Sequence, residues 1–380
     1  LCLCYDVRFL LHVLRMVYMT EDEPLAWLSK YGLRDRNLVR LVPVVREEIS
    51  SLIPLLPTTP KRAREKILSA INLSLHAAVS PSQAITILGA SPSTVTTYLH
   101  AVKSDVEAVL ERQRELARKM IKEMGIRQAW IAVDTTKIPY YGRFQRFIFN
   151  DERGSPCLLY ATTVAVSRQS YIPLTIWQLD FPVLKTDIIE IALRSAEELK
   201  LRPSGILLDR YFYDVAVVNY LKNHGVRFII GAKKTAKIKK LVDSLPKEAV
   251  LVTPYRMRSG EGETADVWLV AFWKGKKLIT LIASDAETAS KAPLYFKRAR
   301  VETFHRDIKR FKPKTASRDF HFRWLLITLS FLIVTIYLYW MVRGRSRRGS
   351  IIGLDGLRIL VFRTLLPENT SQLLLGKAHM

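Results

Sequence analysis

The sequence predicts an α/β fold with a partly parallel sheet, preceded by a helical region. Three observations lead to this prediction. Residues 20–123 read as helical, with amphipathic and charged stretches broken by prolines. From residue 129, strand-like and helical segments alternate, as expected where helices connect parallel strands. Residues 249–283 contain three strand-like runs separated by turns, which indicates a β-rich antiparallel insertion at about 245–285.

We expect four parts along the chain. They are an uncertain N-terminal segment at 1–19, a helical region at 20–123, an α/β domain at 124–345 and a C-terminal tail at 346–380. The first segment is apolar but interrupted by charges, and it lacks the cleavage site of a signal peptide.

Within the helical region, residues 80–102 fit two short helices joined at Gly89. Ser91 is expected to cap the second helix, with Pro92 at its first position. The spacing is that of a helix-turn-helix, whose second helix would enter the major groove of DNA. A plain helical hairpin is the alternative interpretation. Residues 105–124 are expected to form one long charged helix.

Each expected element of the α/β domain has its own signal. An apolar β-type run at 129–138 places Asp134 at or near its end, and Gly205–Arg210 is a buried strand that ends on Asp209. The other expected strands are 157–167, 171–181 and 226–230, and the expected helices are 187–200, 214–224 and 291–314.

Composition narrows the class of partner. The chain has 380 residues, with 59 Lys and Arg against 35 Asp and Glu, a formal net charge of +24. Such an excess predicts a polyanion as partner, nucleic acid first and an anionic membrane surface second, and disfavours an enzyme of small anionic metabolites. Three cysteines are too few for a disulfide framework and have no zinc-site spacing, which fits a reducing cytoplasm.

One apolar segment raises the question of a membrane. Trp324–Val342 contains no charge and is long enough to span a bilayer. Basic residues flank it on both sides, so the positive-inside rule assigns no orientation. A buried central helix is the other interpretation, and the residues before this segment favour it.

Three acidic residues are candidates for metal-dependent chemistry. Asp134 and Asp209 are both expected at the carboxyl edge of the sheet, where ligand sites concentrate, although single aspartates at such positions are often turn formers or caps. Glu302 belongs to a pattern in which Tyr295, Arg298, Glu302 and Lys309 would share one face of a helix. An exposed charged helix is the plainer interpretation.

These residues carry a resemblance to a known family. The spacing Tyr-x2-Arg-x3-Glu-x6-Lys, with Asp134 in AVDTTKI and Asp209 in LLDRYF, makes residues 129–340 similar to the DDE transposases of prokaryotic insertion sequences. The resemblance implies a ribonuclease-H-like catalytic domain, with the first Asp on the first strand, the second after the fourth, and the Glu on a helix that packs against the sheet. It also implies that Trp324–Val342 is the buried helix after the Glu helix.

The resemblance further implies a mechanism and partners. Asp134, Asp209 and Glu302 would hold two Mg²⁺ or Mn²⁺ ions for cleavage at the element ends and in-line strand transfer. The expected partner is double-stranded DNA, namely the terminal inverted repeats and the target. The expected assembly is a homodimer or larger synaptic complex, cytoplasmic, nucleoid-associated and without a membrane.

Other residues receive narrower expectations. Arg298 and Lys309 would grip phosphates, Tyr295 would contact the DNA backbone, and Arg210, Lys233 and Lys234 are further candidates for DNA contact, with a solvated face as the alternative. His305 is expected on the surface or facing phosphate rather than in the site. Trp268 or Trp273 could stack on a flipped base, with core packing as the alternative, and neither one is singled out for that role. Asp180, Asp187 and Asp285 are expected to be caps or turn formers.

Two alternative functions remain open from the sequence. A metal-dependent DNA nuclease without strand transfer would use the same three acids. An inactive transposase-derived protein, retained for DNA binding, would keep the acids without the activity.

Overall fold

The computed structural model describes residues 61–77, 79–102, 106–142, 148–150, 153–167, 171–179, 182–243 and 245–345. The predictions for 1–19, for 20–60, for 346–380 and for Asp180 lie outside these residues. The chain divides into two compact units, one of Leu1–Glu123 with Arg306–Met380 and one of Met124–His305.

The first unit is helical in its described part. Its helices are α4 (Lys61–Ala77), α5 (Pro81–Ile87), α6 (Pro92–Val102), α7 (Val106–Glu123) and α13 (Phe320–Arg345). The predicted pair of short helices is present as α5 and α6. A capping box between Ser80 and Gln83 starts α5, and Gly89, with φ of +68°, forms the turn between them. A role for this pair in reading DNA stays a prediction.

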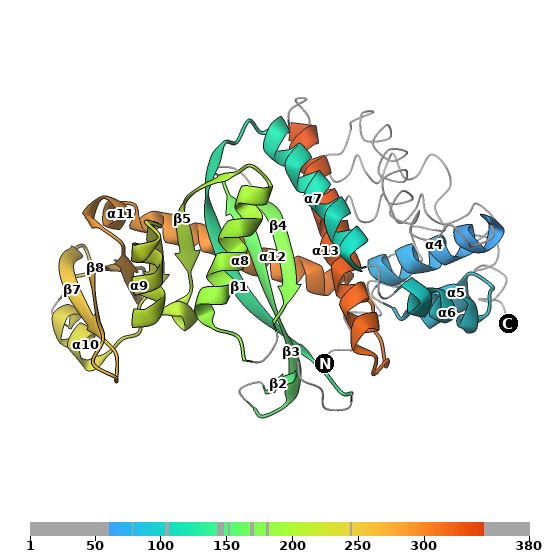
Figure 1. Ribbon diagram of the computed structural model, residues 1–380, viewed down its shortest axis with the longest axis horizontal. Helices are drawn as coiled ribbons and strands as arrows, with labels where there is room; N and C mark the ends of the chain where they lie inside the picture. The colour runs from blue at the N-terminus through green and yellow to red at the C-terminus, as the bar shows by residue number, and fades with distance from the viewer. Residues whose placement is uncertain are drawn as a thin grey trace. The chain divides into compact units, whose positions relative to one another are not determined.

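The long apolar helix α13 runs beside α7 in this unit (Figure 1). By length and composition, Phe320–Val342 is able to cross a membrane, but most of its residues are buried inside the protein, as in the core helix of a soluble protein. Its polar groups have partners within the unit: Tyr337 Oη lies 2.5 Å from His76 Nε2, and Tyr339 Oη donates to Glu123 at 3.1 Å. These contacts favour the buried-helix interpretation.

The second unit is built on a nine-stranded mixed sheet. Strands β1, β5 and β6 are parallel to one another, whereas β3 is antiparallel to β1, β2 and β4. The sheet is therefore mixed and has a parallel section, as predicted. The strands are β1 (Gln128–Pro139), β2 (Ile148–Asn150), β3 (Pro156–Val166), β4 (Tyr171–Gln178), β5 (Arg202–Leu208), β6 (Phe228–Gly231), β7 (Val250–Arg258), β8 (Thr264–Lys274) and β9 (Lys277–Ala283).

The three strands predicted at 249–283 are present and antiparallel. They do not form a separate layer, because β9 pairs antiparallel with β6 and so continues the main sheet through β8 to β7. Their status as an insertion stays a prediction.

Helices flank the sheet and fix its core. Helix α8 (Lys185–Glu198) lies in front of the strands in Figure 1, and its buried residues pack on β1, β3, β4 and β5. The segments η1 (Arg210–Phe212) and α9 (Val215–Asn223) connect β5 to β6, α10 (Ala236–Val242) connects β6 to β7, and α11 (Ala286–Ser290) follows β9. Strand residues such as Ile131, Val133, Leu207 and Ile229 are fully buried, which makes the parallel section the rigid base of the unit.

The prediction of a single helix over 291–314 is wrong. Residues Ala292–Arg298 form a 3₁₀ segment, η2, and the α-helix α12 spans only Ala299–Phe311. Pro293 has no backbone N–H, and the N–H of Leu294 donates to the carbonyl of Lys291 at 2.8 Å, an i to i+3 bond. Tyr295 and Arg298 therefore precede the α-helix that carries Glu302.

Candidate functional site

Asp134 and Asp209 lie side by side at the carboxyl end of two parallel strands. The last parallel pair between β1 and β5 joins Ala132 to Leu207, and each aspartate follows two residues later. Asp134 does not close its strand, contrary to the prediction. Strand β1 continues to Pro139 because it pairs with β3 along its whole length, with Asp134 opposite Thr162.

Asp209 also has a structural role. It follows β5 directly and caps the 3₁₀ turn η1, where its Oδ1 accepts a hydrogen bond of 2.9 Å from the N–H of Tyr211. Burial raises the pKa of Asp209, against the opposing effects of Arg298 and of the N–H groups of Tyr211 and Phe212. The carboxylate is held in a fixed position at the sheet edge.

Arg298 joins the first and third predicted acids. Its Nη1 donates to Asp134 Oδ2 at 3.4 Å, and its Nη2 contacts Glu302 Oε1. The Arg298 and Asp134 side chains are 13% and 14% exposed, so this ion pair is largely shielded from solvent. Tyr295 completes the group, with its ring centroid 5.7 Å from the Arg298 Cζ.

Burial disfavours the charged form of the buried acidic side chains in this group. Burial raises the pKa of Asp134 to about 6; Arg298 acts in the opposite direction, and Asp209 and Glu302 add to the increase. The charges of Arg298, Asp209 and Glu302 all affect the pKa of Asp134. The three predicted acids share one electrostatic site, in which negative charge is costly without a nearby cation.

Tyr295 is positioned by a close approach to the end of β6. A Cβ added to Gly231 would lie 2.6 Å from the Tyr295 hydroxyl and 3.2 Å from the Arg210 backbone nitrogen. Burial raises the pKa of Tyr295, so its hydroxyl remains protonated. Glycine at 231 thus leaves room for the phenol beside Arg298.

The expectation that His305 is a surface or phosphate-facing residue is wrong. It is 7% exposed, its Nδ1 lies 3.8 Å from Asp134 Oδ2, and its Nε2 hydrogen-bonds the hydroxyl of Thr162. Thr162 was not predicted from the sequence as a residue of the site. Its signal was a pair of threonines in the otherwise apolar run of β3, where a buried hydroxyl needs a partner.

The remaining candidates differ in their placement. Burial raises the pKa of Tyr295, and the charge of Arg210 acts against that effect. Arg210 is exposed in η1, and Lys233 and Lys234 are exposed between β6 and α10. Lys309 lies farther along α12, in the other compact unit. Trp273 donates its Nε1–H to the Leu245 carbonyl at 3.0 Å, which gives it a structural role.

Two acidic residues act as caps, as predicted. Asp187 Oδ2 accepts from the N–H of Leu184 at the start of α8, and Asp285 Oδ1 accepts from the N–H of Thr288 at the start of α11.

The donor chemistry of the cluster fits a hard divalent cation. Carboxylate oxygens are the ligands that Mg²⁺ and Mn²⁺ prefer, and burial of Asp134 and Asp209 makes a counter-charge favourable. In the described part of the chain, no three His, Cys, Asp or Glu side chains are already grouped around one point as metal ligands. Arg298 instead lies between Asp134 and Glu302, so an incoming cation would compete with its guanidinium.

One comparison with known protein families gives a match that overlaps this site in the sequence. Residues 180–336 match the family model of a transposase DDE domain. The match contains Asp209, Arg298 and Glu302, whereas Asp134 precedes it. No curated protein matches the chain. The family is one of transposases, which generally use divalent metal ions, and residues 180–336 are similar to its DDE domain.

Proposed function

We propose that this protein is a DNA transposase of a prokaryotic insertion sequence, which cleaves DNA at the element ends and joins the ends to a target by in-line phosphoryl transfer. The observation that carries the proposal is the grouping of Asp134, Asp209 and Glu302 around Arg298 at the carboxyl edge of the parallel strands. The match to a transposase DDE domain supports it.

The sheet supports a ribonuclease-H-like catalytic domain. Apart from the short β2, the strands β1, β3 and β4 form an antiparallel meander, and β5 and β6 add to β1 in parallel. Asp134 lies on the first strand of this set and Asp209 follows the fourth. This is the placement that the resemblance implies.

Asp134, Asp209 and Glu302 are the residues that would hold two Mg²⁺ or Mn²⁺ ions. When bound, such ions activate the attacking oxygen and stabilise the leaving oxygen. The rest of the site binds and orients. His305 and Thr162 fix Asp134, and Arg298 supplies positive charge to the carboxylates and to a phosphate that enters beside them.

The DNA contacts of the proposal extend from this cluster. Tyr295 lies beside Arg298 and contacts the backbone near the cleaved bond, and Lys309 acts as a point charge. Arg210, Lys233 and Lys234 are exposed cations on the segments that follow β5 and β6, and they bind the DNA backbone farther out. The helical region with α5 and α6 binds the terminal repeats. Two or more copies act together on paired element ends, in the cytoplasm at the nucleoid.

The proposal is tested by measuring whether the protein joins a DNA end to a target plasmid. A DNA end that carries the native flanking sequence and a labelled 3′ strand is incubated with plasmid, Mg²⁺ and the full chain. Covalent transfer of label to the plasmid is expected. Metal-dependent cutting without transfer would instead identify a nuclease, and sequence-specific binding without either reaction would identify an inactive DNA-binding descendant.

A further inference from the structure

A basic groove lies at the opposite edge of the sheet from the carboxylates. It has a volume of about 1460 Å³ and is lined by the segments that precede β1, β5 and β6, by the end of α8 and by η2. Trp130 lies against Gly205 at its floor, where Gly205 has no side chain to obstruct the indole. All lining residues belong to the unit Met124–His305.

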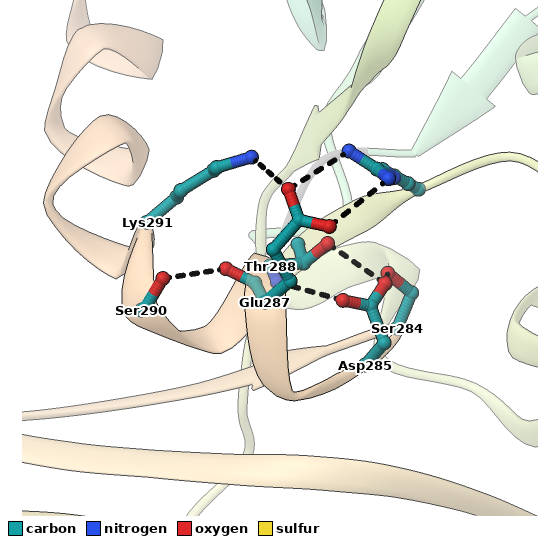
Figure 2. Close-up of polar contacts among 7 residues, drawn as sticks. Ser284, Asp285, Glu287, Thr288, Ser290 and Lys291 are labelled. Carbon is teal, nitrogen blue, oxygen red and sulfur yellow. Dashed lines mark hydrogen bonds and ion pairs between the residues drawn. The ribbon is translucent and has the colours of Figure 1, made fainter.

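The groove is strongly positive. Five basic side chains line it against one acidic side chain, Glu197. Two of the cations share one carboxylate: Glu287 accepts hydrogen bonds from Arg227 at 3.1 and 3.3 Å and from Lys291 at 2.5 Å. Figure 2 shows the contact between Glu287 and Lys291. None of the carboxylates that the structure describes pairs with Arg127, Arg202 or Lys297. These three cations are available to a ligand.

The groove is separate from the catalytic site. Gln128, at its rim, and Asp134 are the two ends of a stretch of β1 that spans about 20 Å. A phosphate bound at Arg127 is therefore not the phosphate that lies among the carboxylates. It belongs to another part of the same DNA or to a second DNA segment.

The arrangement of the cations fits a polymer better than a small anion. Arg127 precedes β1, Arg202 begins β5 and Lys297 stands in η2, so the charges come from three separate elements along the groove. The volume exceeds the roughly 300–1,000 Å³ of most small-molecule pockets. Spaced, unpaired cations along an open groove match the regular phosphates of a DNA backbone.

We infer that this groove, at Arg127, Arg202 and Lys297, binds the phosphodiester backbone of a DNA segment outside the catalytic site. The inference rests on the proposed function, that the chain acts on DNA. It assigns these three residues to affinity rather than to chemistry: Arg127 and Arg202 lie at the starts of β1 and β5, and Lys297, although it precedes Arg298, lines the groove.

The test compares two triple variants of the full chain. Arg127→Gln/Arg202→Gln/Lys297→Gln neutralises the groove, and Lys247→Gln/Lys276→Gln/Lys277→Gln removes the same charge from exposed positions outside it. Fluorescence anisotropy with a labelled duplex gives the dissociation constant at several salt concentrations. Each phosphate contact contributes about 0.9 to the magnitude of the slope of log affinity against log salt concentration. The slope of the groove variant should therefore be smaller in magnitude by up to about 2.7. The control variant should stay close to the wild type.

Several results would overturn the inference. One is an equal loss of slope in both triple variants, and another is an unchanged slope in the groove variant although the wild type binds DNA. Calorimetric binding of a nucleoside triphosphate that is lost only in the groove variant, without a change in the DNA slope, would assign the groove to a small phosphate ligand instead. If circular dichroism shows that the triple variant is unfolded, the single variants Arg127→Gln and Arg202→Gln are measured instead. Each should reduce the magnitude of the salt slope by about 0.9.

A second variant moves affinity in the opposite direction. Glu287→Gln releases Arg227 and Lys291 from their ion pairs, so DNA affinity should rise. A fall in affinity would count against the groove. The outcomes separate failure of the proposed transposase activity from failure of the groove inference. A chain that binds DNA through the groove and never cuts it refutes only the catalytic activity. A chain that binds no DNA refutes both.

Discussion

The Nδ1 atom of His305 lies 3.8 Å from Oδ2 of Asp134, which links the helix of Glu302 to the strand of Asp134. The other ring nitrogen of His305 bonds the hydroxyl of Thr162, the residue opposite Asp134 in the β1/β3 pairing. Two of the proposed metal ligands are thus held at a fixed separation by a buried histidine.

Replacing His305 should therefore weaken metal binding. His305→Ala is expected to raise the Mn²⁺ concentration for half-maximal cleavage by roughly 10- to 100-fold, as loss of a residue that orients a ligand commonly does. Direct Mn²⁺ binding, followed by electron paramagnetic resonance, should shift by the same factor. His321→Ala, at an exposed position, is the control. Unchanged Mn²⁺ affinity in His305→Ala would refute the positioning role.

Arg298 should contribute most to the stability of the fold when no metal ion is bound. Arg298→Gln leaves the buried Asp134 carboxylate without its cation, so the free energy of unfolding in chelator should fall by on the order of 3 kcal/mol. Urea unfolding measures this change. Added Mg²⁺ should restore part of the loss, because it supplies the missing charge.

The matched control for Arg298 is Arg194→Gln, which breaks the exposed ion pair between Arg194 and Glu190. It should cost less than about 1 kcal/mol. If Arg298→Gln costs no more than this control, Arg298 does not neutralise the acidic cluster.

The raised pKa of Asp134 predicts a pH dependence for the metal-free protein. Its pKa is about 6 in the fold and 3.8 as the reference value. The folded state binds this proton more tightly, so the contribution of Asp134 to stability is fully present below pH 3.8 and is lost as pH rises from 3.8 to about 6. The fall amounts to on the order of 3 kcal/mol.

Asp134→Asn should remove that fall. Urea unfolding in chelator from about pH 4 to pH 8 is expected to show the variant more stable than the wild type at the upper end and similar at the lower end. Asp266→Asn, at an exposed strand position, should keep the wild-type profile in this window. A parallel profile for the wild type and Asp134→Asn would contradict the raised pKa.

The close approach of Gly231 and Tyr295 predicts that a substitution at Tyr295 restores part of the stability lost by a substitution at Gly231. Gly231→Ala places a Cβ 2.6 Å from the Tyr295 hydroxyl, which should lower the free energy of unfolding by about 1–3 kcal/mol. Tyr295→Phe removes the clashing oxygen, so the double variant should be more stable than Gly231→Ala alone. Gly260→Ala, which meets no atom within 4 Å, should be nearly neutral. Additive losses in the double variant would show that the two residues do not interact.

The local elements were largely predictable from the sequence because their signals are local. The turn at Gly89, the cap at Asp285 and the strands before Asp134 and Asp209 follow from residue types and periodicity over a few positions. Four motif residues with fixed spacing were enough to predict the acid at Glu302. Its proximity to Asp134 through Arg298 is consistent with that prediction.

What the sequence could not supply depends on contacts between distant segments. Strand β1 continues past Asp134 because β3 pairs with it, and His305 is buried because Thr162 meets it from a strand more than a hundred residues earlier. The 3₁₀ segment before Glu302 has a helix-compatible sequence, and Pro293 was its one local signal. The groove of Arg127, Arg202 and Lys297 joins three segments whose charges, taken singly, look like ordinary surface residues.

The three-carboxylate site is tested by cleavage of DNA that carries the native flanking sequence, by the full chain with Mg²⁺ or Mn²⁺. The comparison includes Asp134→Asn, Asp209→Asn and Glu302→Gln, with anisotropy as a separate measure of DNA binding. Cutting should require metal, and each substitution should abolish cutting while DNA binding survives. Full cleavage by Glu302→Gln, or cleavage by the wild type in chelator, would contradict the three-carboxylate site.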